Sequence, residues 1–563
     1  MPTQSPKRRP RAELLALQGP LPEGIREPFK PTELTWTQRF PMGTGGENHS
    51  VPTDSLAPDE AVGLVNLRPT PGGLVPVWGS LEIGTPKASP TEVLNINLYK
   101  EIDGTSRLIM LDEDDLRHWD GSSWSTVTGG GAAMTGADTD RIRSAMVLNE
   151  FVWVNGVNAP KAWQVGEANY SNLTADVNAP ATARHVAAFA DRVVFADIGA
   201  GASRNTQRLE WSVSGDATDF TGVGAGGATL FDASDDAASD DIMALKVFDE
   251  FLVVFRQRSI WVGQRTGEAA APIRFHSLVQ GTGTIAEDSV QVVGDAGIVF
   301  LGPDNVYLFH PERRGLLPVG EPIKALLFKT EGNVDVGGAA GAMPFDTSRP
   351  HLVRSAYVSD TQCYHLFYPQ TGDTWTTTAV VFDVGRFTNE ERFIWHRRTY
   401  NEADIDITAA FGGQTLGLGS SYTRREQKLL TGSDLGEVFA ADRSTSTDDG
   451  TAITWLFQSP DFTAGTQYVD LRRLGIAYSA SSTVANNTIS FYTNGTVGTT
   501  ATYSFTDTAM NDLPIESSFH APLGVYGRTI GFTIYNFVSA GLGLRLIGYR
   551  IGFIPRGEIS TTF

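Results

Sequence analysis

Seven stretches of the chain share one pattern: a hydrophobic strand, a short turn, and a second strand that ends in an aromatic residue. Their starts lie 41 to 66 residues apart. They fall near Arg107, Glu150, Asp191, Glu250, Ala296, Gln362 and Gln427. Blades of a β-propeller recur about every 40 to 50 residues, and one blade cannot bury its apolar faces alone. The pattern predicts a propeller over about residues 91–445, and the spacing is compatible with six, seven or eight blades.

The flanking regions extend this all-β prediction. A chain of 563 residues is too long for one hydrophobic core, and 41% apolar with 19% charged residues is a globular composition. Residues 36–90 contain apolar alternation around Pro71, Gly72 and Gly73, which predicts a β-hairpin segment. Residues 446–563 alternate apolar and polar positions in closely spaced strands, which predicts a smaller antiparallel sandwich or hub. Whether the two regions form one hub stays open at this point.

Residues 1–35 form an extended, Pro-rich segment that carries a short basic arm. The basic residues are Lys7, Arg8, Arg9 and Arg11. One interpretation is a frayed, solvated terminus. The other is an arm that docks on a partner ring, and we list these four residues as candidates for that contact.

Two long inserts between repeats predict functional or mobile loops. Residues 332–342 are Gly-rich, and residues 221–241 are Gly-rich and then acidic. The acidic positions are Asp232, Asp235, Asp236, Asp240 and Asp241. A charge run is commonly a solvated loop, and the sharper hypothesis is that these loops lie near a channel or a subunit interface.

The sequence carries no recognisable enzyme or metal motif. It lacks a nucleophile elbow, a phosphate-binding loop, an HExxH pair and a paired CxxC, and its nine histidines are scattered. Its one cysteine, Cys363, permits no internal disulfide. We therefore predict no catalytic residue, no cofactor and no bound metal. The net charge of −20 predicts weak affinity for free nucleic acid.

Aromatic residues near the ends of the repeats are predicted to fill the space between blades. These residues are Trp119, Trp163, Trp211, Trp261, Phe309 and Trp375. The other interpretation is a stacking platform for a sugar or a base. No apolar stretch approaches the length of a bilayer span, and the N-terminus lacks the apolar run of a secretory signal. We expect synthesis in a cytoplasm.

Several segments together resemble one protein family, the tail nozzle proteins of short-tailed bacteriophages, also called tail tubular B or packaged-DNA stabilisation proteins. The segments are NLRPTPGGLVPVWG at 66–79, the stretches 191–220, 251–264 and 281–309, and FIWHRR at 393–398. The C-terminal strands match only as a generic hub-like module.

The resemblance implies a structural protein of the virion tail, made in the host cytoplasm. It implies a hexameric ring below the portal and adaptor, the head–tail connector. Each subunit contributes a propeller and a β hub, and the ring encloses the exit channel through which DNA is ejected during host cell entry. The implied partners are further copies of the chain, adaptor proteins, tail fibre or tail plug proteins, and genomic DNA that passes without sequence-specific binding.

Two other functions remain open at the level of sequence. One is a tail propeller that binds a receptor or glycan through exposed aromatic residues, and it predicts binding by the isolated protein. The other is a propeller glycosidase or depolymerase, which needs a carboxylate pair at a defined separation. The segment QTGDTW at 370–375 keeps the Gly-x-Thr-Trp end of a sialidase turn but has Gln370 in place of its Asp.

Overall fold

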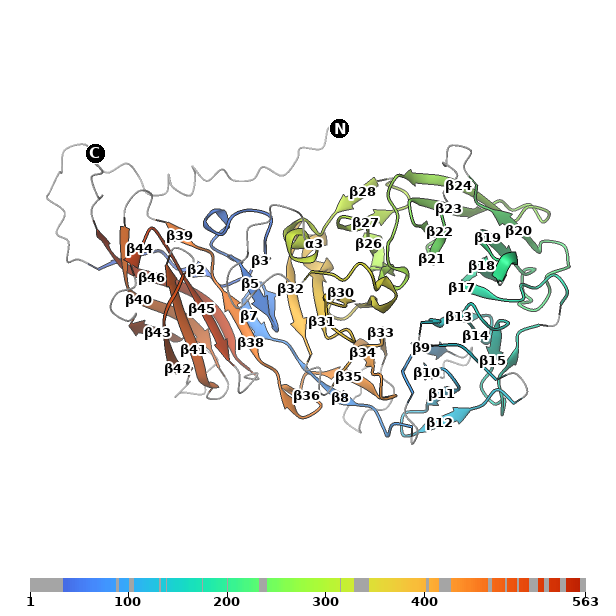
Figure 1. Ribbon diagram of the computed structural model, residues 1–563, viewed down its shortest axis with the longest axis horizontal. Coiled ribbons are helices and arrows are strands. Elements are labelled where there is room, and N and C mark those ends of the chain that lie inside the picture. Colours follow the sequence, from blue (N-terminus) through green and yellow to red (C-terminus); the bar gives the residue numbers. More distant parts are fainter. Residues whose placement is uncertain are drawn as a thin grey trace.

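The structure is a computed structural model, and two β modules lie side by side in it (Figure 1). The described residues are 34–87, 91–100, 106–130, 133–137, 139–174, 176–199, 201–231, 240–313, 315–328, 344–400, 405–414, 427–463, 468–480, 484–493, 496–505, 515–520, 526–536 and 543–556. The larger module is a β-propeller and the smaller one is a hub of antiparallel strands. The predicted fold class, an all-β propeller with a smaller β module, is confirmed.

The propeller consists of seven four-stranded antiparallel blades around one axis (Figure 1). Blades one and two comprise β9 (Asn95–Lys100), β10 (Ser106–Leu111), β11 (Leu116–Trp119), β12 (Trp124–Val127), β13 (Arg143–Val147), β14 (Glu150–Val154), β15 (Lys161–Trp163) and β16 (Ser171–Asn172). Blades three and four comprise β17 (Ala183–Phe189), β18 (Arg192–Ile198), β19 (Asn205–Trp211), β20 (Gly226–Thr229), β21 (Ile242–Phe248), β22 (Phe251–Arg256), β23 (Ser259–Arg265) and β24 (Ile273–Gln280). Neighbouring inner strands contact one another around the whole ring, and β33 in blade seven meets β9.

The remaining blades complete the ring. Blades five and six comprise β25 (Gln291–Val292), β26 (Ile298–Leu301), β27 (Val306–His310), β28 (Gly315–Pro318), β29 (Arg354–Val358), β30 (Cys363–Tyr368), β31 (Thr378–Asp383) and β32 (Trp395–Thr399). Blade seven comprises β33 (Ala409–Gln414), β34 (Gln427–Gly432), β35 (Val438–Asp442) and β8 (Gly79–Glu82). Each of the seven sequence repeats begins at the second strand of a blade, and all except the sixth include the third strand that follows the turn.

Blade seven is closed by a strand from the N-terminal side of the propeller. β8 pairs antiparallel with β35, and it also pairs with β36 (Thr447–Asp448), which forms a small hairpin with β37 (Thr451–Ala452). A Cβ atom at Gly79 would lie 2.1 Å from the carbonyl oxygen of Thr447, so only glycine fits there. The blade therefore takes strands from outside residues 91–445, the range that the sequence assigned to the propeller.

Apolar clusters fill the spaces between all adjacent blades. Trp163 packs with residues of blades one and two, Trp211 with blades three and four, and Phe309 with blades four and five. This packing agrees with the predicted role of the aromatic positions. Trp375 differs: it is half-buried in a turn, because the third strand of blade six begins only at Thr378.

The hub is made of strands from both ends of the chain. Its N-terminal strands are β1 (Thr35–Trp36), β2 (Phe40–Pro41), β3 (Gly46–Glu47), β4 (Glu60–Ala61), β5 (Gly63–Val65), β6 (Leu67–Thr70) and β7 (Gly73–Pro76). Its C-terminal strands are β38 (Trp455–Gln458), β39 (Phe462–Thr463), β40 (Tyr468–Ser479), β41 (Val484–Thr493), β42 (Thr496–Phe505), β43 (Ile515–His520), β44 (Tyr526–Gly527), β45 (Thr529–Asn536) and β46 (Arg545–Arg556). The hairpin β6–β7 joins β46, so the two regions form one hub.

The hub and the propeller share a sheet. β32, the outer strand of blade six, pairs with β5, and β5 pairs with β38 of the hub. Beside this junction the buried Arg397 forms two contacts of 2.8 and 2.9 Å with the carboxylate of Glu47. A second arginine, Arg398, forms an ion pair at 2.6 Å with Asp448. Continuous hydrogen bonding and the buried pair of Glu47 and Arg397 fix the two modules to each other, while Arg398 and Asp448 join blade six to the β36 strand beside blade seven.

Helices are short. They are η1 (Thr53–Ser55), η2 (Gly201–Ser203), η3 (Glu287–Ser289), η4 (Gly294–Ala296), η5 (Glu321–Ile323), α2 (Lys324–Leu327), η6 (Pro350–Leu352) and α3 (Val384–Glu390). Asp383 caps the N-terminus of α3 by accepting a hydrogen bond from the backbone N–H of Arg386. Within the described ranges, no helix has the length and apolar character needed to cross a membrane.

Candidate functional site in the propeller channel

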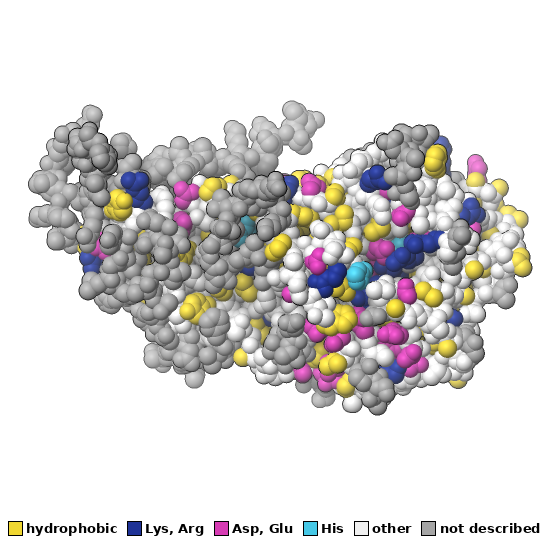
Figure 2. Space-filling view, viewed as in Figure 1, with side chains coloured by type: hydrophobic (Ala, Val, Ile, Leu, Met, Phe, Trp, Pro, Cys, Tyr) yellow, Lys and Arg dark blue, Asp and Glu magenta, His cyan; other side chains and the backbone are white. Residues whose placement is uncertain are grey.

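The inner strands of the seven blades line a central cavity of about 640 Å³. Successive side chains of a strand point to opposite faces, so each inner strand sends some residues toward the axis and others into the space between blades. Figure 2 shows Lys, Arg, His and acidic side chains gathered near the centre of the propeller face. A cavity lined by convergent polar groups is the first candidate for a functional site.

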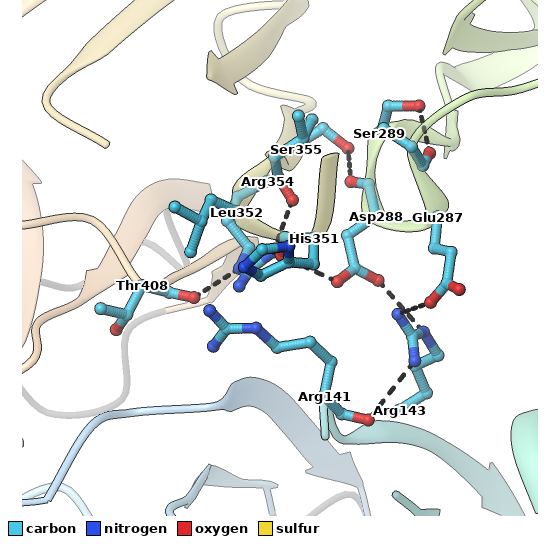
Figure 3. A network of polar contacts seen from close by, with 12 residues as sticks. Arg141, Arg143, Glu287, Asp288, Ser289, His351, Leu352, Arg354, Ser355 and Thr408 are labelled. Atoms are coloured by element: carbon cyan, nitrogen blue, oxygen red, sulfur yellow. Dashed lines mark hydrogen bonds and ion pairs between the residues drawn. The ribbon is translucent and has the colours of Figure 1, made fainter. Parts of the chain in front are cut away.

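Two carboxylates at the start of blade five organise the channel. Glu287 and Asp288 lie on η3, just before the inner strand β25. Arg143 of blade two forms ion pairs with both, and its Nε lies 3.2 Å from Asp288 Oδ1. Arg184 of blade three lies 3.6 Å from Glu287. The carboxylates thus connect blades two, three and five across the channel, and Figure 3 shows the contact of both with Arg143.

Arg354 adds blade six to the network. Its Nη1 lies 3.5 Å from Asp288 Oδ2 and donates hydrogen bonds of 2.6 Å to the carbonyl oxygens of His351 and Val353. The hydroxyl of Ser355 donates to the carbonyl oxygen of Asp288 at 2.6 Å. Figure 3 shows Asp288 between Arg354 and Arg143. Four blades therefore meet at one pair of acidic residues.

The electrostatics keep Asp288, Arg143 and Arg354 ionised. Burial raises the pKa of Asp288, but the positive charges of Arg143 and Arg354 outweigh burial and hold that pKa below its usual value. Burial lowers the pKa of Arg143, and Asp288 and Glu287 reverse that effect and raise it. Burial and Arg141 lower the pKa of Arg354 to about 9, so it remains charged at neutral pH.

Two further basic side chains line the channel. Burial lowers the pKa of Lys246, and Asp288 offsets only part of that effect. Burial and the charge of Arg143 lower the pKa of His185 to about 3, so His185 is neutral at pH 7. Its Nε2 lies 3.2 Å from the carbonyl oxygen of Ile242, and the ring donates a hydrogen bond between blades three and four.

This arrangement suits a structural role better than proton transfer. A general acid in glycoside hydrolysis needs a raised pKa, whereas arginines lower the pKa of Asp288. Arg143, Arg354 and Lys246 outnumber Glu287 and Asp288 among the described residues that line the cavity, so this lining is positively charged. The network can act as a cross-brace between blades, or attract an anion into the channel.

The structure corrects part of the sequence-based prediction for the acidic loop. Asp240 was expected in a channel or interface loop, but it is 2% exposed and belongs to the interior of blade four. Its carboxylate accepts hydrogen bonds from Ser259 Oγ at 2.6 Å and from the backbone N–H of Arg258 at 2.8 Å. Asp241 is half-buried and accepts a hydrogen bond from Thr206 of blade three at 2.5 Å.

The other candidate residues lie outside the described residues. They are the arm residues Lys7, Arg8, Arg9 and Arg11, the loop residues Asp232, Asp235 and Asp236, and the loop 332–342. Their predicted contacts stay predictions.

Sequence reasoning missed the channel residues because it concentrated on the second and third strands of each blade. A usable signal was present, however. Lys246 interrupts the apolar strand IMALKVF, and a charge inside such a strand indicates a residue that faces a polar channel. Glu287 and Asp288 lie within a segment, 281–309, that carries the family resemblance, but nothing in its local pattern pairs them with Arg143 or Arg354.

Comparisons with known proteins found no family and only distant structural neighbours. No protein-family model and no curated protein matches the chain. Among solved structures, the WD40 repeats of RRP9 align over 65% of this chain and 99% of theirs, with 10% identity and a TM-score of 0.41. U3-55K aligns over 63% and 99%, with 11% identity and a TM-score of 0.37. The extracellular domain of the hybrid two component system BT4673 from B. thetaiotaomicron aligns over 66% and 53%, with 10% identity and a TM-score of 0.28.

Proposed function

We propose that this protein is a structural component of a bacteriophage tail, a nozzle subunit that forms a ring below the portal and adaptor. In this role the ring encloses the DNA exit channel, retains the packaged genome and then lets it pass. The proposal takes the ring, its six-fold symmetry and its partners from the resemblance described above. The fold is compatible with it, since the family combines a propeller with a β hub.

The observation that carries the proposal is the rigid union of the two modules. A ring subunit must transmit force without bending at its middle, and here β5 continues the sheet of blade six into the hub. The buried pair of Glu47 and Arg397 lies at the same junction. Closed rings need a defined angle between the surfaces that a subunit presents to its two neighbours, and a rigid body supplies that angle.

The charge distribution supports a passive path for DNA. The whole chain carries a net charge of −20, whereas the described lining of the propeller channel is positively charged. Ion pairs between blades connect the charged residues of this lining. The excess of negative charge is therefore carried elsewhere on the subunit. An acidic wall repels phosphate and gives no counterion-release affinity, so DNA slides along it.

The oligomeric state of the purified chain tests the proposal. Mass photometry and negative-stain imaging, alone and with candidate adaptor rings, are expected to show a closed ring with a central hole. A persistent monomer or trimer that never docks onto an adaptor contradicts the nozzle and favours the receptor- or glycan-binding propeller. Turnover of a polysaccharide by the pure protein would instead favour the depolymerase.

Attachment of the basic arm is tested separately. Removal of residues 2–12 is expected to weaken docking onto the adaptor ring while leaving ring formation intact. The matched control replaces Lys7, Arg8, Arg9 and Arg11 with Gln and keeps the length of the arm. It therefore distinguishes the effect of the positive charge from the effect of the length of the arm. If both variants attach to the adaptor ring as the parent protein does, the arm is not a docking element.

A further inference from the structure

A second, smaller pocket lies where the hub hairpin meets blades six and seven. The volume of this pocket is about 80 Å³, which is enough for a small ligand of a few non-hydrogen atoms. Its apolar wall includes Pro76, Val381 and Leu429, and its polar residues come from three separate parts of the chain. The channel network uses none of these residues.

Two arginines at this pocket stack on the same tryptophan ring. The guanidinium groups of Arg68 and Arg443 lie 4.9 and 4.6 Å from the ring centroid of Trp78. Neither forms an ion pair within 4 Å with a described carboxylate, in contrast to their neighbours Arg398 and Lys428. Stacking on an aromatic ring holds a guanidinium in place and leaves its N–H donors free for an anion.

Two histidines, the buried His396 and the half-buried His365, add hydrogen-bonding capacity. His396 lines the pocket, is 3% exposed, and has an Nδ1 atom without a hydrogen-bond partner among the described residues. His365 lines it too, and its Nδ1 is also without a partner in the described part of the chain. Burial, with the charges of Arg398 and Arg68, lowers the pKa of His365 to about 3, and the pKa of His396 also falls well below its ordinary value. Each neutral imidazole still carries one N–H donor.

The charges around the pocket favour an anion. Four cations lie at the pocket: Arg68, Arg398, Lys428 and Arg443. Two of them have a carboxylate partner, since Lys428 pairs with Asp442 and Arg398 pairs with Asp448. A third carboxylate, Asp383, interacts with Arg68 at longer range. Four cations against three carboxylates leave an excess of one positive charge. The excess positive charge at the half-buried Arg68 and the exposed Arg443 attracts an anionic group of small volume.

We propose that this pocket binds one small anionic group, a phosphate or a carboxylate, held by Arg68 and Arg443 with the N–H groups of His365 and His396 nearby. Planar guanidinium groups suit both ligands because they can offer two parallel N–H donors. The anion bridges the hub hairpin, which carries Arg68, and the strand end of blade seven, which carries Arg443. Occupancy therefore stabilises the closure of the propeller onto the hub. The inference does not depend on ring formation.

Titration of the full-length protein with inorganic phosphate and, in a separate arm, with sodium acetate tests the proposal. Sodium chloride keeps the ionic strength constant, so general screening does not contribute. Isothermal titration calorimetry is expected to show binding of at least one of the two anions, together with a rise in Tm. Phosphate binding alone assigns a phosphate-type ligand, and acetate binding alone assigns a carboxylate.

Variants locate the binding site. Arg68→Gln and Arg443→Gln are each expected to weaken binding by about tenfold or more, because each loses a charge-assisted hydrogen bond. Arg443 is exposed, so Arg443→Gln keeps the test valid even where Arg68→Gln disturbs folding. The matched control is Arg528→Gln, which removes an arginine stacked on Tyr468 in the hub. No binding of either anion, or equal binding by Arg443→Gln and the parent protein, overturns the proposal.

Discussion

At the scale of single residues, buried ionisable groups join parts of the chain that are distant in sequence. Glu47 and Arg397 are 350 positions apart and have 0% and 1% exposed side chains. Burial raises the pKa of Glu47, but Arg397 and His49 outweigh burial and hold it below its usual value. A pair of this kind is costly to break, because the remaining partner becomes an uncompensated buried charge.

Substitution of Glu47 by Gln is expected to destabilise the protein by about 3 kcal/mol, since it leaves Arg397 charged and unpaired. Urea denaturation at pH 7 measures the change. Because the pKa of Glu47 is lowered in the folded state, its contribution is present above the pKa of the unfolded chain and disappears as pH falls through the folded value. The difference between variant and parent should therefore shrink in acid. An equal difference at all pH values contradicts this assignment.

The buried His185 makes a second prediction at this scale. Its pKa falls from 6.5 to about 3 on folding, so between these values only the unfolded chain takes up the proton. Stability should therefore fall by about 1.4 kcal/mol per pH unit on account of this group as pH drops below 6.5. His185→Gln can keep the hydrogen bond to Ile242 and should flatten the acid limb of the stability curve. A parallel curve for the variant contradicts the prediction.

At the scale of elements, the closing strand β8 decides whether blade seven is complete. It precedes blade one in sequence, yet it is the fourth strand of the last blade. Propellers avoid an open seam in this way, since the strand links the first and last blades through the covalent chain. The position of β8 next to the β36–β37 hairpin depends on Gly79, because any side chain at this residue would clash with the backbone of Thr447.

Gly79→Val is expected to detach β8 and destabilise blade seven. Hydrogen exchange of the β35 amides, which pair with β8, should become at least tenfold faster. A decrease of about 1.4 kcal/mol in the free energy of local opening gives a tenfold change. The matched control is Gly315→Val, at the start of the outer strand of blade five, where a Cβ atom meets nothing closer than 3.7 Å. Equal exchange in both variants contradicts the role of β8.

At the scale of the whole molecule, neither module is complete within one continuous segment. The hub combines strands from residues 35–76 and 455–556, and the propeller takes β8 from the segment between hub and blade one. The described part of the chain thus starts and finishes in the hub, with the propeller inserted between (Figure 1). Shared strands of this kind make the two modules interdependent.

A fragment of residues 91–445 is therefore expected to be poorly folded, although it spans all seven inner strands. A fragment of residues 77–453 restores β8 and the β36–β37 hairpin and should resist limited proteolysis better. The comparison uses protease resistance of both fragments at equal concentration. Equal resistance would show that the closing strand contributes little to the propeller.

Much of the fold could be predicted from local patterns. The apolar strands and turns near Glu150, Glu250 and Gln427 recur because each blade repeats the same local chemistry. The Pro-Gly-Gly turn likewise predicted the hairpin β6–β7. The third strand of blade six was placed too early, because Trp375 in a turn has the same local appearance as an aromatic strand end.

The channel network and the pocket were not predictable in this way. Arg143 and Asp288 are 145 positions apart, and Arg68 and Arg443 are further apart still. Nothing in the sequence near one partner indicates the other. The same limit explains Asp240, which looked like part of an acidic loop and is a buried acceptor inside blade four.

The sequence by itself determined the all-β class, the repeated strand–turn–strand unit and the apolar residues that fill the space between blades, because alternation and turn chemistry act over a few residues. Only the tertiary structure decided the number of blades, the closing role of β8, the single hub built from both ends, and the charges that meet at the channel and the pocket. Ring closure brings together residues with no local relation, so their pairing depends on the geometry of the whole chain.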